Sequence, residues 1–185
     1  MREAQSYHAK PRKWRLLSVL NFAQFHPPEQ SVDYEMAYWL MKSEPDVYSI
    51  DDLERDGREM WDSIRNYQAR NMMRDDMVIG DEVFFYHSNC KEPGIVGIMK
   101  VASEPYPDPV QFDKKSNYYD PKSTKAEPRW ILVDVEFVRK LKRNITLTEI
   151  KADKRLEDMI LTRRGNRLSI MPIEKKHWNR ILSLE

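Results

Sequence analysis

The sequence predicts an α+β domain, a small and mostly antiparallel β-barrel of about five to six strands with short peripheral helices. Strand-like segments recur at irregular spacing, which does not suit the regular alternation of a doubly wound parallel sheet. The helix signals between them are short and carry their own caps. A hydrophobic fraction of 41 % in 185 residues is enough for one packed core.

The first 35 residues differ from the rest of the chain. The segment "KPRKWRLLSVLNFAQFHPPEQ" has a basic start and a short apolar centre, but no small-residue cleavage site follows, so it fits a signal or transit peptide poorly. We expect Met36 to be the native start and residues 1–35 to be an upstream extension. This extension should be weakly ordered, with at most a short helix near residues 13–22. Residues 36–185 then form the single domain.

The domain should begin with a strand and a capped helix. Residues 38–42, "YWLMK", alternate and are rich in aromatic side chains, which is typical of a strand. Ser49 with Asp52 resembles a capping box that opens the helix "IDDLERD", and Gly57 closes it.

The middle of the chain predicts a second helix and a hairpin. Asn66 can cap a helix that runs to about Asp76. Residues 81–88 and 94–103 are strand-like and flank the turn "NCKEPG", so they should pair as a hairpin. Residues 104–128 contain five prolines and should form a long surface loop, and residues 129–141 carry the longest strand signal.

The last part of the chain should end in a strand and a helix. Thr146 with Glu149 suggests another capped helix. Residues 167–171, "RLSIM", are strand-like, and Pro172 suits the first position of a closing helix, "PIEKKHWNRILSL".

Charge is distributed unevenly although the net charge is only +1. Residues 36–121 hold 10 Lys and Arg against 17 Asp and Glu, whereas residues 122–185 hold 16 against 9. A basic half permits contact with a polyanion. The alternative is that the two halves neutralise each other within one fold.

Several classes of site find little support. The single cysteine excludes an intrachain disulfide, the four histidines lack ligand-like spacing, and no glycine-rich loop is present to cradle phosphates. His87 and Ser88 alternate in a strand and so point to opposite faces, which argues against a base–nucleophile pair, and Cys90 follows in the turn. No apolar run approaches the roughly 20 residues that span a bilayer. We therefore expect no metal, no cofactor, no catalytic residue and no membrane contact.

The stretch "WDSIRNYQARN", residues 61–71, combines flat rings with planar hydrogen-bonding groups. Such a set suits a heteroaromatic ligand, because a nucleobase stacks on rings and offers its edge to hydrogen bonds. The alternative is that Trp61 and Tyr67 belong to the core and that Asn66 is only a helix cap. The same two interpretations apply to Trp39 and Trp130, and there a place in the core is favoured because both lie within predicted strands.

A family resemblance sharpens this hypothesis. The segments "WLMKSEP", "WDSIRNYQARNMMR", "FFYHSNCKEPGIVGIMKV", "YPDPVQFD", "YDPKS", "PRWILVDVEFVRKLKR" and "RLSIMPI" resemble the EVE domain family from about Met36 to Glu185. This resemblance implies a PUA-like barrel whose pocket receives a flipped modified base, such as a five-position-modified cytosine in DNA or a modified base in RNA. Matched by motif position, the implied pocket residues are Ser43, Trp61, Asn66, Tyr67, Tyr86, His87 and Ser88, with Lys42, Arg70, Pro107, Asp108 and Trp130 in second rank.

The sequence thus favours a non-enzymatic reader of a modified nucleobase, with Arg163, Arg164 and Arg167 as phosphate contacts. An enzyme that acts on a nucleotide or modified nucleic acid through the same pocket is the main alternative, with only His87 and Asp108 as candidates. A protein-interaction module is the third. We expect a monomer in the cytoplasm, or in the nucleus if the source is eukaryotic.

Overall fold

The computed structural model describes residues 36–185. The weak order expected for residues 1–35, and the short helix expected near residues 13–22, lie outside the described residues.

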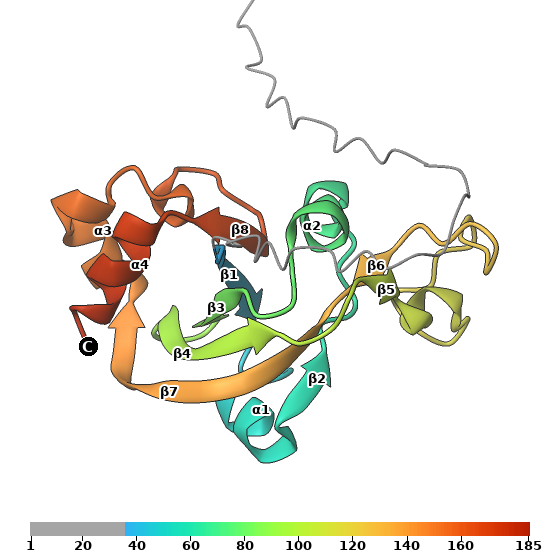
Figure 1. Ribbon diagram of the computed structural model, residues 1–185, viewed down its shortest axis with the longest axis horizontal. Coiled ribbons are helices and arrows are strands. Elements are labelled where there is room, and N and C mark those ends of the chain that lie inside the picture. Colours follow the sequence, from blue (N-terminus) through green and yellow to red (C-terminus); the bar gives the residue numbers. More distant parts are fainter. Residues whose placement is uncertain (1–35) are drawn as a thin grey trace, which may run out of the picture. The chain divides into compact units, whose positions relative to one another are not determined.

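The described chain is built on one curled sheet (Figure 1). Six strands follow the order β2-β7-β4-β3-β1-β8, and two short strands, β5 and β6, form a separate pair. All pairs are antiparallel except β1 with β3. The α+β class and the mostly antiparallel half-barrel are therefore as predicted. The strands are β1 (Tyr38–Ser43), β2 (Arg58–Met60), β3 (Glu82–His87), β4 (Gly94–Val101), β5 (Tyr106–Pro107), β6 (Ile131–Leu132), β7 (Asp134–Thr146) and β8 (Ile170–Ile173).

Short helices lie around this sheet (Figure 1). The predicted capping boxes are present in α1 (Ile50–Asp56) and α3 (Leu147–Ala152), and Asn66 caps α2 (Tyr67–Asn71). Helix α2 continues as a π-helical turn, η1 (Met72–Asp76). The remaining helices are α4 (Lys175–Leu182) and the 3-10 turns η2 (Pro109–Phe112), η3 (Lys154–Leu156) and η4 (Ile160–Thr162).

The central strands bury both faces, and their alternation separates two cores. Trp39 and Phe85 pack with Trp61 in one core. Phe84 and Tyr86 pack with the helices of the C-terminal part in the other. A side chain on β1 or β3 therefore faces one core or the other according to its parity.

Two predicted elements differ in the structure. The strand expected at residues 129–141 is two strands, β6 and β7, interrupted at Val133, whose carbonyl accepts from the Trp61 N–H at 3.0 Å. Pro172 was expected to open the closing helix, but it lies in β8 opposite Trp39, and α4 begins at Lys175. Strand β8 is the edge of the sheet, where a proline removes no ladder hydrogen bond.

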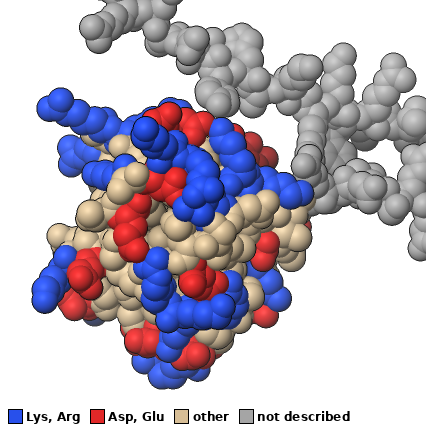
Figure 2. All heavy atoms as spheres, turned by 90° about the vertical axis from the view of Figure 1, so that its left-hand side faces the viewer, with Lys and Arg blue, Asp and Glu red and all other residues tan. Residues whose placement is uncertain are grey.

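The face that carries α3 and α4 is rich in Lys and Arg, with acidic side chains among them (Figure 2). Some of its cations are paired locally, for example Arg180 with Asp153 and Lys176 with Asp158. Within residues 36–185, no helix has the length and apolarity needed to cross a membrane.

Candidate functional site

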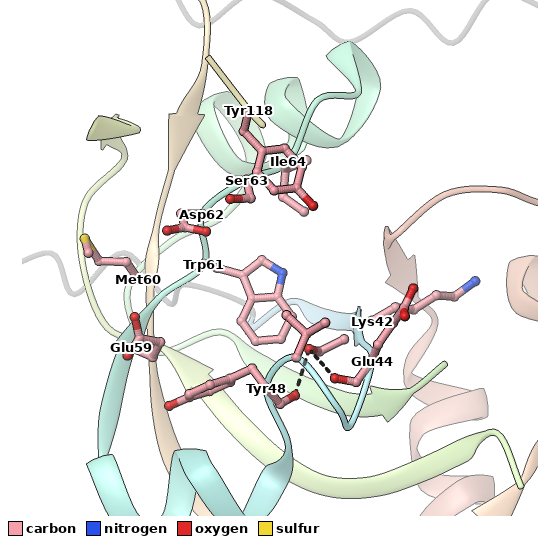
Figure 3. A pocket seen from close by; sticks show the side chains of 12 residues that line it. Lys42, Glu44, Tyr48, Glu59, Met60, Trp61, Asp62, Ser63, Ile64 and Tyr118 are labelled. Atoms are coloured by element: carbon pink, nitrogen blue, oxygen red, sulfur yellow. Dashed lines mark hydrogen bonds between the residues drawn. The ribbon is translucent and has the colours of Figure 1, made fainter. Parts of the chain in front are cut away.

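A cavity of about 400 Å³ opens where β1 ends, next to the β2–α2 connection (Figure 3). Three segments far apart in sequence build it: the end of β1 with the loop before α1, the end of β2 with the following loop, and one residue of the long loop after η2. Its lining consists of Lys42, Ser43, Glu44, Val47, Tyr48, Glu59, Met60, Trp61, Asp62, Ser63, Ile64 and Tyr118.

Trp61 lies in the centre of this lining (Figure 3). The side chain is 6 % exposed and meets the Phe85 ring edge to face, with centroids 5.5 Å apart. The indole N–H groups of Trp39 and Trp130 donate to Asp81 and Asp120. The indole N–H of Trp61, in contrast, has no acceptor among residues 36–185. A buried indole that keeps a free donor beside a cavity suits a ligand that supplies an acceptor.

The backbone at Ser63 is held in an unfavourable conformation. Its φ of 61° lies in the left-handed region, which costs free energy for any residue with a Cβ. The Ser63 N–H donates to Asp108 Oδ2 at 3.2 Å, and Asp108 is almost fully buried. Asp108 also accepts from Arg65 Nη1 at 2.7 Å and from the Val110 N–H at 2.8 Å. It therefore fixes the backbone at Ser63, at the edge of the cavity, from its buried side.

Arg65 extends this network to the far wall of the cavity. Its guanidinium donates twice to the Tyr118 carbonyl, from Nε at 2.9 Å and from Nη2 at 2.6 Å. The same group lies 5.6 Å from the Tyr118 ring centroid and 5.3 Å from that of Trp130. Arg65 therefore connects the loop that carries Tyr118 to the buried Asp108.

The side of the cavity next to β1 is anchored by main-chain bonds. Ser43 Oγ donates to the Tyr48 carbonyl at 2.7 Å, so its hydroxyl is engaged within the wall. The Lys42 N–H donates to the Ser169 carbonyl at 2.9 Å. Burial lowers the pKa of the Lys42 ammonium, which lies 5.6 Å from the Tyr86 ring centroid. The C-terminal segment therefore approaches the cavity at Lys42.

Of the residues expected in the pocket, the structure places Ser43, Trp61 and Lys42 in the lining. Tyr86 lies in the core on the opposite face of β3, as its parity requires. The imidazole Nε2 of His87 accepts from the Ile50 N–H at 3.2 Å, and burial lowers the pKa of this histidine.

The other expected residues lie around the cavity. Ser88 donates to the Ser43 carbonyl from its N–H at 2.8 Å and from Oγ at 3.3 Å. Asn66 accepts from two N–H groups of α2. Half-exposed Tyr67 stacks on Trp130 at 4.8 Å, with the Arg70 guanidinium 5.0 Å from the Tyr67 ring centroid.

The remaining expected residues have structural partners or lie apart. Arg70 also donates to the Arg129 carbonyl, and Pro107 pairs with Ile131 in the small sheet. Arg163, Arg164 and Arg167 are exposed and form no ion pair with any residue of the described domain.

Sequence reasoning missed most of the polar lining. Glu59, Asp62 and Ser63 adjoin Trp61 along the chain, and the last two lie inside the stretch at 61–71 that was singled out. That stretch contains the signal, but a carboxylate and a hydroxyl are common on any surface and do not by themselves indicate a binding site. Tyr48 and Tyr118 reach the cavity only through the tertiary fold.

One cluster of groups has the composition of a metal site. Single ligand atoms of Asp158, Glu174 and His177 lie within 4.8 Å of one another. The Lys176 ammonium lies among them, at 2.5 Å from Asp158 and 3.2 Å from Glu174. This cation already compensates the carboxylates, so the cluster is an ion-pair network.

Comparisons with known proteins agree with the fold and the motifs. A sequence profile described as the EVE domain matches residues 37–184. Human thymocyte nuclear protein 1 is 46 % identical over 168 residues, which cover 80 % of this chain and 74 % of that protein. A crystal structure of a Pseudomonas syringae protein is 49 % identical, with a TM-score of 0.77 over 80 % of this chain and 99 % of that one.

One related structure was solved with a bound DNA. The structure of human THYN1 in complex with 5-methylcytosine-containing DNA is 46 % identical, with a TM-score of 0.75 over 80 % of this chain and 96 % of that one. The half-barrel seen here is thus the PUA-like fold that the motifs implied. The chain belongs to the EVE domain family.

Proposed function

We propose that this protein is a non-enzymatic reader that binds DNA containing a modified cytosine and receives the flipped base in the cavity at Trp61. The observation that carries this proposal is the Trp61 indole, which lines a cavity of about 400 Å³ and whose N–H has no acceptor among residues 36–185. A flipped base is held by stacking and by hydrogen bonds to its edge, and this wall offers both. The complex of human THYN1 with 5-methylcytosine-containing DNA supports the choice of DNA and of cytosine.

The backbone of the nucleic acid would follow the C-terminal segment. Strand β8 pairs with β1, and the Ser169 carbonyl is bonded to Lys42 at the cavity. Arg163, Arg164 and Arg167 immediately precede this point and are exposed. Cations that precede Ser169 in the chain suit the phosphates on either side of a flipped nucleotide.

A non-enzymatic role is supported by the two catalytic candidates. The Nε2 atom of His87 already accepts from a backbone N–H, and Asp108 is occupied by three donors. Mass spectrometry of a bound oligonucleotide should recover it intact, and a free base, a deaminated base or a cleaved strand would instead indicate an enzyme. The name of the thymocyte nuclear proteins supports a nuclear location if the source is eukaryotic.

The test is substitution of Trp61, with titrations and thermal melts run together. Trp61→Ala should weaken binding of a 5-methylcytosine duplex by about 5- to 150-fold, the loss of one base–aromatic stack. It should also destabilise the fold by about 3–5 kcal/mol, because the ring is part of the core.

A matched control separates these two effects. Trp39 lies in the same core, is equally buried and does not line the cavity. Trp39→Ala should destabilise the fold similarly but leave the affinity of the folded protein unchanged. Equal affinities for the two variants, measured below both melting temperatures, would remove Trp61 from the binding site.

A further inference from the structure

The carboxylates of the cavity are distributed unevenly around Trp61. Figure 3 shows Glu59 and Asp62 on one side of the ring and Lys42 with Glu44 on the other. Glu44 accepts from the Asn89 amide at 2.9 Å. Glu59 and Asp62 have no side-chain hydrogen bond or ion pair with any residue between 36 and 185. Two carboxylates without a partner among these residues therefore share one side of the cavity.

An ionised carboxylate only accepts hydrogen bonds, so this side favours a ligand edge that donates. Glu59 also raises the pKa of the nearby Tyr48 hydroxyl, after the larger effect of burial. Asp56 and Asp52 raise the same pKa, but both are paired with Arg55, so the charge without a partner on this side comes from Glu59 and Asp62. A carbonyl oxygen placed against these carboxylates would be repelled and would find no hydrogen-bond donor. Rejection of the wrong base in this way contributes more to selectivity than the favourable contact with the right one.

This uneven distribution of carboxylates can distinguish two bases that carry the same methyl group. Thymine carries the same five-position methyl as 5-methylcytosine, and the two bases differ at positions three and four. At position four cytosine presents an amino donor and thymine a carbonyl acceptor. At position three cytosine presents an acceptor nitrogen and thymine an N–H donor. Carboxylates are suited to accept from the cytosine amino group.

We infer that Asp62, assisted by Glu59, accepts from the exocyclic amino group of the flipped base and so makes the cavity select cytosine-type bases over thymine. This inference rests on the proposed function and adds its specificity. The free Trp61 N–H and the Ser63 hydroxyl then serve the acceptor atoms of the same base. The Lys42 side is left for the backbone, next to Ser169.

The experiment measures affinities for four single-stranded oligonucleotides that differ at one central base: 5-methylcytosine, cytosine, thymine and uracil. Single strands remove the contribution of base pairing, which would otherwise favour flipping of a mispaired thymine. The wild-type protein should bind 5-methylcytosine at least about 10-fold more tightly than thymine, in line with the discrimination of one good base contact.

Asp62→Asn replaces one acceptor oxygen by a donor amide without changing the shape of the side chain. It should lower the preference for 5-methylcytosine over thymine by about 10-fold, mainly by raising the affinity for thymine. Glu59→Gln should act in the same direction with a smaller effect. Asp46→Asn is the matched control, because Asp46 is exposed, close in sequence to Glu44 and absent from the lining, and it should leave the preference unchanged.

The possible failures differ from one another. Equal binding of thymine and 5-methylcytosine by the wild type would overturn the inference and leave base binding in place. A preference that survives in both Asp62→Asn and Glu59→Gln would also overturn it. Loss of the preference in Asp46→Asn would show that net charge alone is responsible. No binding of any of the four oligonucleotides, nor of the methylated duplex, would overturn the proposed function itself.

Discussion

Substitution of Asp108 tests whether its buried hydrogen bonds to Ser63 and Arg65 fix the shape of the cavity. Asp108 is 1 % exposed, and its carboxylate accepts hydrogen bonds from Ser63, Arg65 and Val110. Asp108→Asn keeps the shape but brings an amide donor against one of these donors and removes the charge that pairs with Arg65. Removing one partner of a buried ion pair costs about 3–5 kcal/mol.

The lower end of that range applies here. The Arg65 side chain retains 20 % of its exposure and keeps both hydrogen bonds to the Tyr118 carbonyl, so its charge is not left isolated. A loss of about 3 kcal/mol lowers the melting temperature of a domain this size by roughly 6–12 °C. Because Ser63 and Tyr118 both line the cavity, affinity for a 5-methylcytosine duplex should also fall, by about 10-fold.

Calorimetry and anisotropy titrations measure the two effects. Asp134→Asn is the control: its carboxylate holds Arg58 at 2.7 Å and the Tyr106 hydroxyl at 2.6 Å, away from the lining. It should lower the melting temperature without changing the affinity. If Asp108→Asn melted normally, or melted early but bound like the wild type, the network would have no part in shaping the site.

Three further predictions concern other parts of the chain. Replacing Arg163, Arg164 and Arg167 together by Ala should reduce the slope of log K against log salt by up to about 2.7, and an unchanged slope would place the phosphates elsewhere. Burial depresses the pKa of His87, so the stability linked to this group is fully present above its unfolded pKa of about 6.5 and is lost as pH falls through the lower folded value. Urea melts at pH 7 and pH 5 should show this loss of stability, and His87→Gln should make the loss smaller. An NMR titration that gives His87 a pKa at or above 6.5 would contradict this prediction. Residues 36–185 alone should melt within about 2 °C of the full chain, and a fall of several degrees would make residues 1–35 part of the fold.

Local signals in the sequence predicted much of the fold. The two capping boxes and the Asn66 cap depend on atoms within three residues of each other, so the sequence contains the whole interaction. The hairpin of β3 and β4 is similarly local. The prediction that Pro172 opens the closing helix was wrong because a proline suits both a first helical turn and an edge strand. Only the order of the strands in the sheet decides between these two places.

The site was predicted less completely, for a geometric reason. Ser43 and His87 are paired neighbours in the parallel ladder of β1 and β3, yet Ser43 lines the cavity and His87 instead accepts from the start of α1. The motif carries both residues but not the direction in which each points. Tyr118 could not be predicted for a second reason. It is held at the cavity wall by Arg65, which is distant in sequence, and no local sequence pattern indicates that contact.

Trp61 shows why a core residue and a binding residue need not be alternatives. Its ring packs edge to face on Phe85, and its backbone N–H donates to Val133 at the break between β6 and β7. These contacts fix the position of the indole before any ligand arrives, so little side-chain entropy is lost when a base stacks on it. The same ring lines the cavity and carries an indole N–H that has no acceptor in the described part of the chain. A rigid aromatic wall of this kind makes burial in the core part of the binding mechanism, and it explains why stability and affinity must be measured together at this position.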